Sequence, residues 1–472
     1  MAPSSKTCTN SPPILQSYLK SPIMKTYSIM FGLLLALPLV SQAQQSFNKL
    51  KMDSLFTVLE EKNKVMGAVA LYQGDQLVYN RAIGYQSIKD GQKTKATTST
   101  KFRVGSISKT FTAVMVMQLV EQKKLTLETP LAKFFPQFEN ASSITVEHLL
   151  TQRSGLKSFT TDPAYSLYLN QPKTQAQMLE IMLAQKSSFA PGTKYEYSNT
   201  NYVLLGYIVE KVTKQSYAEV LKKNIVDKLG LRNTYYGGKI NSAQQEASSF
   251  RFINDQWTEV PETDMSIPHG AGAVVSTTQD LARFIQALFQ HKLVSEASLA
   301  KMTSMKDNYG MALTPLPLGP YTGYGHGGVI DGFSAMMSYY PTQKVTMVST
   351  FNGVNTNAND VLVGILSIAF NFPYKVPTYA APKNLKLDLA KYEGTFSSQQ
   401  FPLKIVVRKE GEKLVAQATG QGTIDLEARS ESEFVFEPAG IVMEFNKSAA
   451  GAAYDQFTLK QGGGKFTFTK EQ

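Results

Sequence analysis

Residues 102–113 read FRVGSISKTFTA and form the most informative segment of the chain. Apolar residues continue after Ser106 at helical spacing as far as residue 125, which predicts a buried helix. Ser106 and Lys109 are three residues apart and therefore share one face of that helix. A lysine whose pKa is lowered by burial can accept the proton of a neighbouring serine hydroxyl. The segment therefore predicts a nucleophilic serine at a helix N-terminus, where free N–H groups favour negative charge.

The Ser-x-x-Lys pattern occurs at four places, beginning at Ser17, Ser106, Ser154 and Ser298, so the pattern alone identifies nothing. Ser17 lies near the N-terminus, Ser154 in a predicted loop and Ser298 in a predicted helix without a neighbouring glycine. Only Ser106 has both a preceding glycine and a strongly apolar helix after it. The alternative at each place is a solvated serine that happens to precede a lysine.

A second segment, residues 191–199, contains Tyr197 and Asn199 with one residue between them. A tyrosine hydroxyl close to a lysine can move a proton, and an asparagine amide can orient a lysine or a substrate amide. The alternative is structural: Tyr197 would be a core aromatic residue, and Asn199 would cap the apolar helix predicted to begin near it.

A third segment, residues 325–333, reads GHGGVIDGF. Glycines allow a strand edge to approach a substrate backbone closely, so His326, Gly327, Gly328 and Val329 are candidate substrate-binding residues, with His326 facing the pocket. A single histidine is more often structural than functional. The chain has four histidines, none paired at a ligand spacing, so we predict no metal site and no cofactor.

Strand patterns at residues 68–79 and 335–351 enclose a region of predicted helices, so both ends of this part of the chain are expected to build one sheet flanked by helices. The predicted helices span 46–65, 106–125, 145–152, 174–185, 200–213, 217–228, 278–290 and 359–370. Prolines and alanines at 373–385 predict a linker. Short alternating runs at 386–472 predict a small antiparallel barrel or sandwich.

The N-terminus predicts export. Residues 24–43 have a basic start, a 12-residue apolar stretch at 29–40 and small residues before Gln44, as in a cleavable signal peptide. The stretch is shorter than the roughly 20 residues that a membrane span needs, so no stable anchor is expected after cleavage. Residues 1–23 are interpreted as an upstream leader, and they contain the only cysteine, Cys8. The mature chain is expected in the periplasm or outside the cell, without disulfides.

Composition is that of a globular protein, with 43% hydrophobic and 18% charged residues. The formal charge is +11, from 48 basic and 37 acidic side chains, without a Lys/Arg block. We interpret this as a generally basic surface suited to anionic envelope material and predict no nucleic-acid binding.

The three segments occur in one order, each in matching surroundings, and residues 45–370 resemble the serine β-lactamase and penicillin-binding-protein superfamily. The resemblance is to the branch with class C β-lactamases, D-alanyl-D-alanine carboxypeptidases, D-aminopeptidases and esterases. It implies an α+β fold: an antiparallel sheet flanked by helices with an all-helical subdomain, in a domain at 44–372. Residues 386–472 resemble, from the Tyr392-Glu393-Gly394 motif onward, the lipocalin-like β-barrel appended to some of these hydrolases.

The resemblance implies that Ser106 attacks a carbonyl to form an acyl-enzyme while Lys109 and Tyr197 move the proton. The backbone N–H groups of Ser106 and Val329 would form the oxyanion hole. Asn199 and the strand at 326–329 would bind a small-molecule or short-peptide substrate, cell-wall-derived ones among them.

The chain departs from the family at the usual Lys-Thr-Gly triplet, which is His326-Gly327-Gly328 here. The lysine charge and the threonine hydroxyl that help to hold a substrate carboxylate are therefore missing, which lowers the expectation of β-lactam hydrolysis. We expect a D,D-peptidase-like or esterase-like hydrolase. The alternatives are a class C-like β-lactamase and a penicillin or peptidoglycan sensor without efficient turnover.

Overall fold

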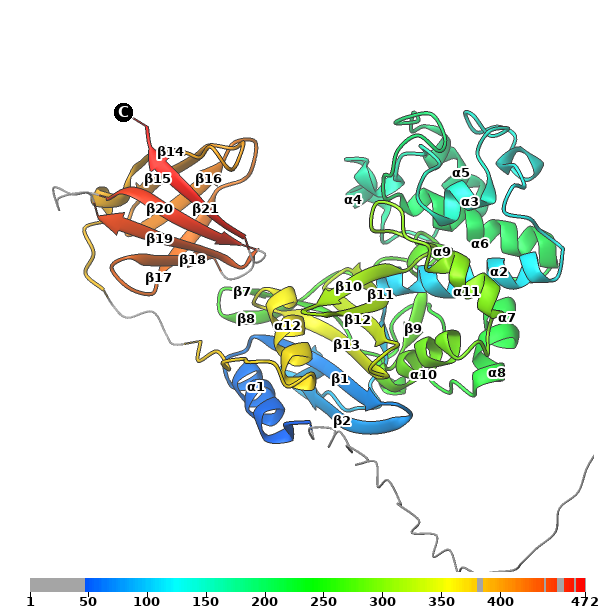
Figure 1. Cartoon of the computed structure of the whole chain (residues 1–472), viewed down its shortest axis with the longest axis horizontal. Helices are drawn as coiled ribbons and strands as arrows, with labels where there is room; N and C mark the ends of the chain where they lie inside the picture. Colours follow the sequence, from blue (N-terminus) through cyan, green and yellow to red (C-terminus); the bar gives the residue numbers. More distant parts are fainter. Residues whose placement is uncertain (1–46, 380–384, 437–438, 448–453, 462–463, 472) are drawn as a thin grey trace, which may run out of the picture. The chain divides into compact units, whose positions relative to one another are not determined.

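Figure 1 shows the computed structural model of the chain, which describes residues 47–379, 385–436, 439–447, 454–461 and 464–471. The predicted leader and signal peptide, and residues 380–384 of the predicted linker, lie outside the described residues. No helix in the described part of the chain is long and apolar enough to cross a membrane.

The centre of the first domain is an antiparallel sheet formed by both ends of that domain. Its strands, in sheet order, are β10 (Thr314–Leu318), β11 (Tyr321–Ile330), β12 (Phe333–Tyr340), β13 (Val345–Val354), β1 (Val65–Gln73) and β2 (Gln76–Ile83). The N-terminal strand β1 pairs with the late strand β13, with Val69 opposite Ser349. Strands β1 and β13 are each paired on both sides and buried along most of their length, so they are interior strands of the sheet. The predicted α+β fold is confirmed.

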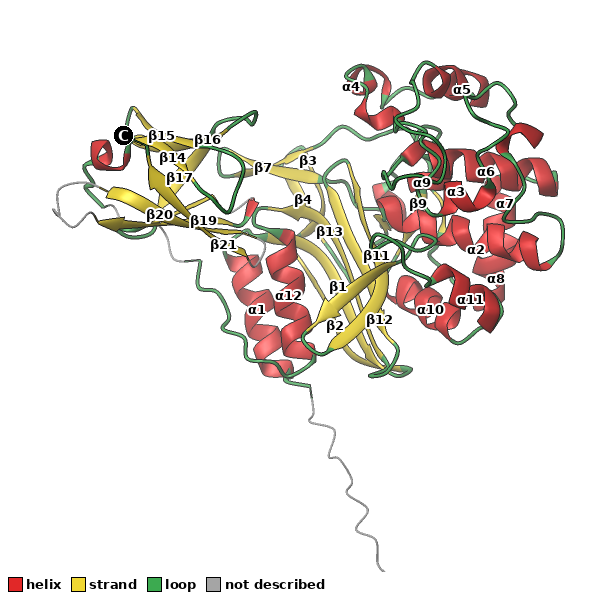
Figure 2. Cartoon of the chain, turned by 45° about the horizontal axis from the view of Figure 1, so that its top comes forward, coloured by secondary structure: helices red, strands yellow, loops and turns green. Residues whose placement is uncertain are grey.

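Helices cover both faces of this sheet (Figure 2). Helices α1 (Lys49–Glu61) and α12 (Ala358–Ala369) pack on one face, where Phe56 and Ile365 share a core cluster with Phe351 of β13. On the opposite face, α10 (Thr278–Phe289) and α2 (Ser108–Glu121) belong to a larger core. Helix α10 begins as predicted, because the Thr277 hydroxyl accepts a hydrogen bond from the Asp280 N–H.

The helical region surrounds α2, which is apolar on all sides and is buried along most of its length. Its other helices are α3 (Val146–Leu150), α4 (Tyr165–Tyr168), α5 (Gln175–Leu183), α6 (Asn199–Thr213), α7 (Tyr217–Leu221), α8 (Asp227–Leu229), α9 (His269–Gly272) and α11 (Glu296–Met302).

Three predicted helices differ from the structure by more than two residues at an end or in their continuity. The helix predicted at 46–65 is the shorter α1, Lys49–Glu61, and Val65 already belongs to β1. The helix predicted at 106–125 begins with a 3-10 turn, Gly105–Ile107, and its α-helical part ends at Glu121 because Lys123 has a left-handed backbone conformation. The helix predicted at 217–228 is interrupted by a π-helical turn, Lys222–Val226, between α7 and α8.

Several short strands lie outside the strand order given above. β5 (Phe102–Arg103), β9 (Val274–Ser276) and β6 (Tyr235–Tyr236) form a separate sheet, and β3 (Tyr85–Lys89) pairs with β4 (Gln92–Lys95). The hairpin of β7 (Phe250–Ile253) and β8 (Gln256–Glu259) is attached to the end of β13, where Phe250 is paired with Gly353.

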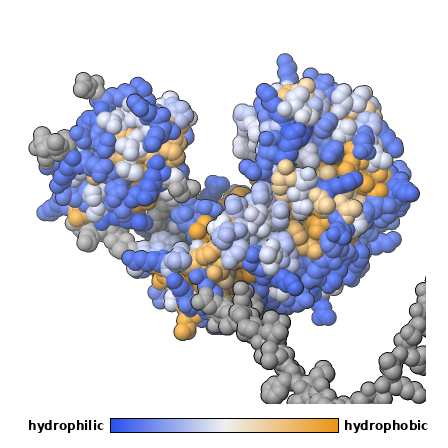
Figure 3. Space-filling view, in the orientation of Figure 1, coloured by the Kyte–Doolittle hydropathy of each residue, from blue (hydrophilic) through white to orange (hydrophobic). Residues whose placement is uncertain are grey.

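The C-terminal strands form a closed antiparallel barrel, as predicted. They are β14 (Gly394–Ser397), β15 (Ile405–Glu410), β16 (Lys413–Ala418), β17 (Ile424–Ala428), β18 (Glu433–Phe436), β19 (Ile441–Lys447), β20 (Tyr454–Gln461) and β21 (Gly464–Lys470). Pairing of Phe396 with Lys470 closes the barrel. Alternation places Ile405 and Val407 inside and Val406 outside, and the barrel face visible in Figure 3 is mostly hydrophilic.

Candidate active site

Ser106 lies in the 3-10 turn immediately before α2, so the N-terminal end of a buried helix carries its hydroxyl. Gly105 has φ +50°, a left-handed conformation that glycine adopts without strain. A Cβ atom at Gly105 would lie 2.9 Å from the Val329 nitrogen. The glycine therefore allows the turn to lie directly against strand β11.

Strand β11 approaches the same turn from its own side through Gly328. A Cβ at Gly328 would lie 1.9 Å from the Val104 carbonyl oxygen and 3.0 Å from the Ser106 nitrogen. At Gly327 the nearest atom to such a Cβ would be 3.5 Å away, an ordinary contact. Of the two glycines, Gly328 is thus the one that the close approach of β11 to Ser106 requires.

Lys109 Nζ lies 3.0 Å from Ser106 Oγ, 2.7 Å from Asn199 Oδ1 and 2.9 Å from the Ala271 carbonyl oxygen. The side chain is fully buried, and burial holds the pKa of Lys109 well below its usual value. A neutral lysine amine has two N–H bonds and one lone pair. Donation to Asn199 and Ala271 uses both N–H bonds and leaves the lone pair for the Ser106 hydroxyl.

Asn199 is itself held in place by the loop that follows α3. Its backbone N–H donates to Ser158 Oγ at 3.1 Å, and its Nδ2 donates to Thr160 Oγ1 at 3.0 Å. These bonds turn Oδ1 toward Lys109. The structural alternative for Asn199 is wrong, because Ser198 occupies the N-cap position of α6 and Asn199 is the first helical residue.

Tyr197 is half-buried beside Lys109, whose Nζ lies 4.9 Å from the centre of the tyrosine ring. Burial raises the pKa of Tyr197 far above its usual value, and a hydrogen bond with Ser106 opposes part of that rise. Tyr197 is therefore a neutral phenol at pH 7, able to donate a proton.

His326 is buried on β11 and packs against two tyrosines. Its Nε2 lies 3.3 Å from Tyr309 Oη, and its ring centre lies 6.3 Å from that of Tyr197. Burial, with a smaller contribution from the ammonium form of Lys109, lowers the pKa of His326 to about 4. The ring is thus neutral at pH 7. In contrast to the prediction, His326 does not line the cavity beside Ser106.

That cavity has a volume of about 590 Å³ and opens next to Ser106 and Asn199. Phe159 and Tyr165 form part of its wall, whereas the nearby Tyr168 does not line it. Tyr168 packs edge-on against Tyr165 instead, with ring centres 5.7 Å apart. Residues from the segments 160–170, 260–272 and 329–331, together with Gly105 and Arg251, complete the wall.

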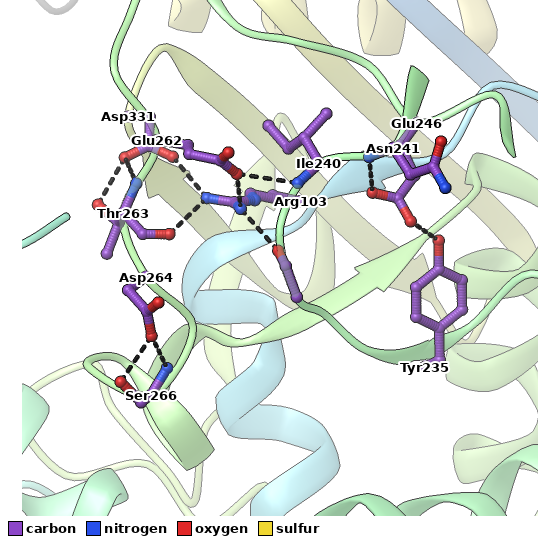
Figure 4. A network of polar contacts seen from close by, with 11 residues as sticks. Arg103, Tyr235, Ile240, Asn241, Glu246, Glu262, Thr263, Asp264, Ser266 and Asp331 are labelled. Carbon is purple, nitrogen blue, oxygen red and sulfur yellow. Dashed lines mark hydrogen bonds and ion pairs between the residues drawn. The ribbon is translucent and has the colours of Figure 1, made fainter. Parts of the chain in front are cut away.

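Sequence reasoning missed an ion-pair network next to this cavity (Figure 4). Buried Arg103 donates to Asp331 Oδ2 at 3.1 Å and to the Thr263 carbonyl oxygen at 2.7 Å, and it also pairs with Glu262. The network ties the loop before α9 and the end of β11 to β5. Arg103 and Asp331 stand in the first and third sequence motifs, but no local pattern links residues so far apart in the chain.

No group of three or more His, Cys, Asp and Glu residues in the described part of the chain could hold a metal ion. The residues that meet around Ser106 are a lysine, a tyrosine and an asparagine. This grouping can activate a hydroxyl nucleophile and move its proton.

An antiparallel sheet flanked by helices, with a Ser-Lys pair at the start of its central helix and the lysine buried, defines the class of the β-lactamase-like proteins. The chain belongs to the Beta-lactamase family, whose model matches residues 52–367. The resemblance drawn from the three motifs is thereby confirmed.

Three relatives illustrate the range of the family. Penicillin-binding protein 4* of Bacillus subtilis is 29% identical over 84% of this chain and 94% of its own length. A D-stereospecific amidohydrolase from Streptomyces sp. is 26% identical, with a TM-score of 0.58 over 67% of this chain and 98% of its own. An octameric penicillin-binding protein homologue from Pyrococcus abyssi, 22% identical, shares the fold over 89% of this chain and 99% of its own, with a TM-score of 0.61.

Proposed function

We propose that the protein is a serine hydrolase that forms an acyl-enzyme at Ser106 and hydrolyses a peptide, amide or ester bond in a small molecule or short peptide. The observation that carries this proposal is the 3.0 Å contact between Lys109 Nζ and Ser106 Oγ, in which the lysine is buried and held by two further acceptors.

In the first step, Lys109 accepts the Ser106 proton as Oγ bonds to the substrate carbonyl carbon. The carbonyl oxygen then carries negative charge, which the N–H groups of Ser106 and Val329 stabilise; such a donor is worth about 3 kcal/mol in other hydrolases. The carbonyl–leaving-group bond breaks, and the leaving group takes a proton through Tyr197. Water then attacks the acyl-enzyme, its proton returns to Ser106 by the same groups, and the acid is released.

The relatives support amide and peptide chemistry, since they include a D-stereospecific amidohydrolase and a penicillin-binding protein. The neutral, buried His326 supplies no cation for a substrate carboxylate, so it favours amides and esters without a carboxylate at that position over β-lactams. We also propose that the protein is exported to the periplasm or beyond the cell, on the basis of the apolar segment at 24–43.

The test uses the chain from Gln44 with four substrates: a penicillin, a D-Ala-D-Ala peptide, a D-amino acid amide and a short-chain nitrophenyl ester. We expect the Ser106→Ala variant to lose hydrolysis of every substrate that the wild type turns over. Intact mass spectrometry should detect an acyl adduct in the wild type alone.

The matched control is Ser298→Ala, which removes the serine of another Ser-x-x-Lys sequence, in helix α11. It should keep wild-type rates. Equal rates in the wild type and Ser106→Ala would contradict the proposal, and a penicillin adduct that is never released would favour the sensor instead.

A further inference from the structure

We propose that the cavity beside Ser106 holds the acyl part of the substrate and that Arg251 binds a carboxylate on that part. The proposal rests on the proposed function, since it assigns the substrate class of the same site. Four observations carry it: the position of the cavity, its charges, the anchoring of Arg251 and the absence of another partner for it.

The position of the cavity identifies which half of the substrate it receives. The cavity wall includes Ser106 and Val329 but neither Tyr197 nor His326. A proton donor must lie next to the leaving-group atom that it protonates. The leaving group is therefore expected on the Tyr197 side, and the acyl part extends from Ser106 into the cavity.

The cavity wall contains two charged side chains, Arg251 and Asp331. The Asp331 carboxylate is only 3% exposed and is already saturated. It pairs with Arg103 at 3.1 Å and accepts hydrogen bonds from the N–H and Oγ1 of Thr263, at 3.1 and 2.6 Å. Figure 4 shows this arrangement. The acid is thus compensated within the protein and is not free to bind a substrate cation.

Of the two charged side chains in the cavity wall, Arg251 is the one that could still bind a charged group of the substrate. It is exposed, and its guanidinium forms no ion pair or hydrogen bond with any side chain or backbone group in the described ranges. A guanidinium presents a planar fork of N–H donors that matches the two oxygens of a carboxylate. An acyl group that ends in a carboxylate would complete this pairing, whereas an acyl group with a free ammonium would be repelled.

The backbone of Arg251 is held firmly against the end of β11. Its neighbour Phe250 is 1% exposed, and alternation along β7 turns Arg251 to the other side. The Gly332 N–H donates to Ser249 Oγ at 3.0 Å, and a Cβ at Gly332 would lie 2.8 Å from the Phe250 carbonyl oxygen. The position from which Arg251 reaches the cavity is therefore set by packing.

The experiment compares p-nitrophenyl esters whose leaving group is identical and whose acyl chains differ only at the far end. The acyl groups are adipate, with a free carboxylate, its monoamide, and aminocaproate, with an ammonium. For each, kcat/KM is measured after subtraction of the Ser106→Ala rate, which also removes non-enzymatic hydrolysis.

We expect the wild type to prefer the carboxylate ester over the amide by about fivefold, the range of a partly exposed ion pair. The ammonium ester should be the poorest of the three. In Arg251→Gln the kcat/KM values of the carboxylate and ammonium esters should approach that of the amide ester. In Arg251→Glu the ammonium ester should become the best substrate and the carboxylate ester the poorest. Added salt should weaken the wild-type preference.

Arg232→Gln is the matched control, since Arg232 is an exposed arginine that does not line this cavity. It should keep the wild-type preference. Equal ratios in the wild type and Arg251→Gln would overturn the assignment while leaving the Ser106 chemistry intact. Hydrolysis that does not depend on Ser106 would overturn the proposed function itself. A stronger preference for a phosphonate-ended ester would overturn the choice of a carboxylate.

Discussion

Lys109 combines two properties that a surface lysine does not have: it is fully buried, and its amine is surrounded by three oxygen atoms. Burial disfavours the ammonium form, and the surrounding acceptors hold the amine at Ser106. A lysine whose pKa is lowered is protonated at low pH and becomes a base as the pH rises. The acid limb of kcat/KM is therefore expected to report the loss of the Lys109 proton.

The Asn199→Asp variant tests this assignment through the pH profile. A carboxylate 2.7 Å from Nζ would favour the ammonium, so the pKa of Lys109 should rise and the acid limb should move to higher pH. Asn199→Ala is the control, because it removes the amide without adding charge. An acid limb that stays in place in Asn199→Asp would contradict the role of Lys109 as the base.

At the same scale, the candidate residues differ in how far sequence could identify them. Ser106 and Lys109 are three residues apart, so helical geometry alone places them together. Tyr197 and Asn199 were candidates by residue type, but only the family resemblance could place them beside Lys109, because no spacing rule brings them there. No sequence pattern pointed to Arg251, since an arginine in a mostly exposed hairpin is ordinarily solvated.

Among the elements, strand β11 and the turn before α2 depend on one another. Gly328→Ala would place a Cβ 1.9 Å from the Val104 carbonyl oxygen, so β11 would have to move away from Ser106. We expect a loss in kcat/KM of about a hundredfold, the effect of a displacement near 1 Å in a site of this kind.

Gly327→Ala is the matched control, one residue earlier on the same strand. A Cβ there would meet nothing closer than 3.5 Å, so near-wild-type rates are expected. Circular dichroism of both variants would show whether the fold is kept. Equal losses in the two variants would contradict the proposed contact between β11 and the turn.

The Arg103 network joins three elements, and its loss should affect stability more than chemistry. Arg103→Met would leave the Asp331 carboxylate buried without its cation, at a cost of about 3 kcal/mol. Urea unfolding would measure this cost. The double variant Arg103→Met/Asp331→Asn should recover part of it, because the unpaired carboxylate that remains, Glu262, is partly exposed to water.

Arg283→Met is the control, because Arg283 is a typical surface arginine. Its side chain is exposed, and its guanidinium donates a hydrogen bond to the Gly230 carbonyl oxygen. A change within about 0.5 kcal/mol is expected. A similarly small change for Arg103→Met would show that the network does not stabilise the fold.

At the scale of the whole molecule, the described chain has separate cores on the two sides of the predicted linker. The clusters on the two faces of the large sheet draw on residues up to Tyr379, with Tyr374 and Val376 packed on one of them. The barrel core comprises aromatic and aliphatic residues from 387 to 468. Each part therefore has the apolar interior that independent folding requires.

A chain cut after Tyr379 is expected to fold and to retain the Ser106-dependent activity of the chain from Gln44 on small esters, because every residue of the candidate site precedes the cut. Melting curves and ester hydrolysis would test this, with Ser106→Ala in the same shortened chain as the control. A shortened chain that folds without activity would show that the barrel contributes to the site.

Local periodicity in the sequence predicted most of the fold. A helical repeat after Ser106, strand patterns at both ends of this region and short alternating runs near the C-terminus were enough to predict one sheet flanked by helices and a small antiparallel barrel or sandwich. Those patterns involve residues only a few positions apart in the sequence. The spacing of apolar side chains along the sequence therefore predicts which of them are buried. The Arg103 and Asp331 ion pair, the buried neutral state of His326 and the place of Arg251 in the cavity wall depend on contacts between residues far apart in the chain. Only the tertiary fold brings such residues into contact, so their ion pairs, protonation states and places in the cavity wall cannot be predicted from local sequence patterns.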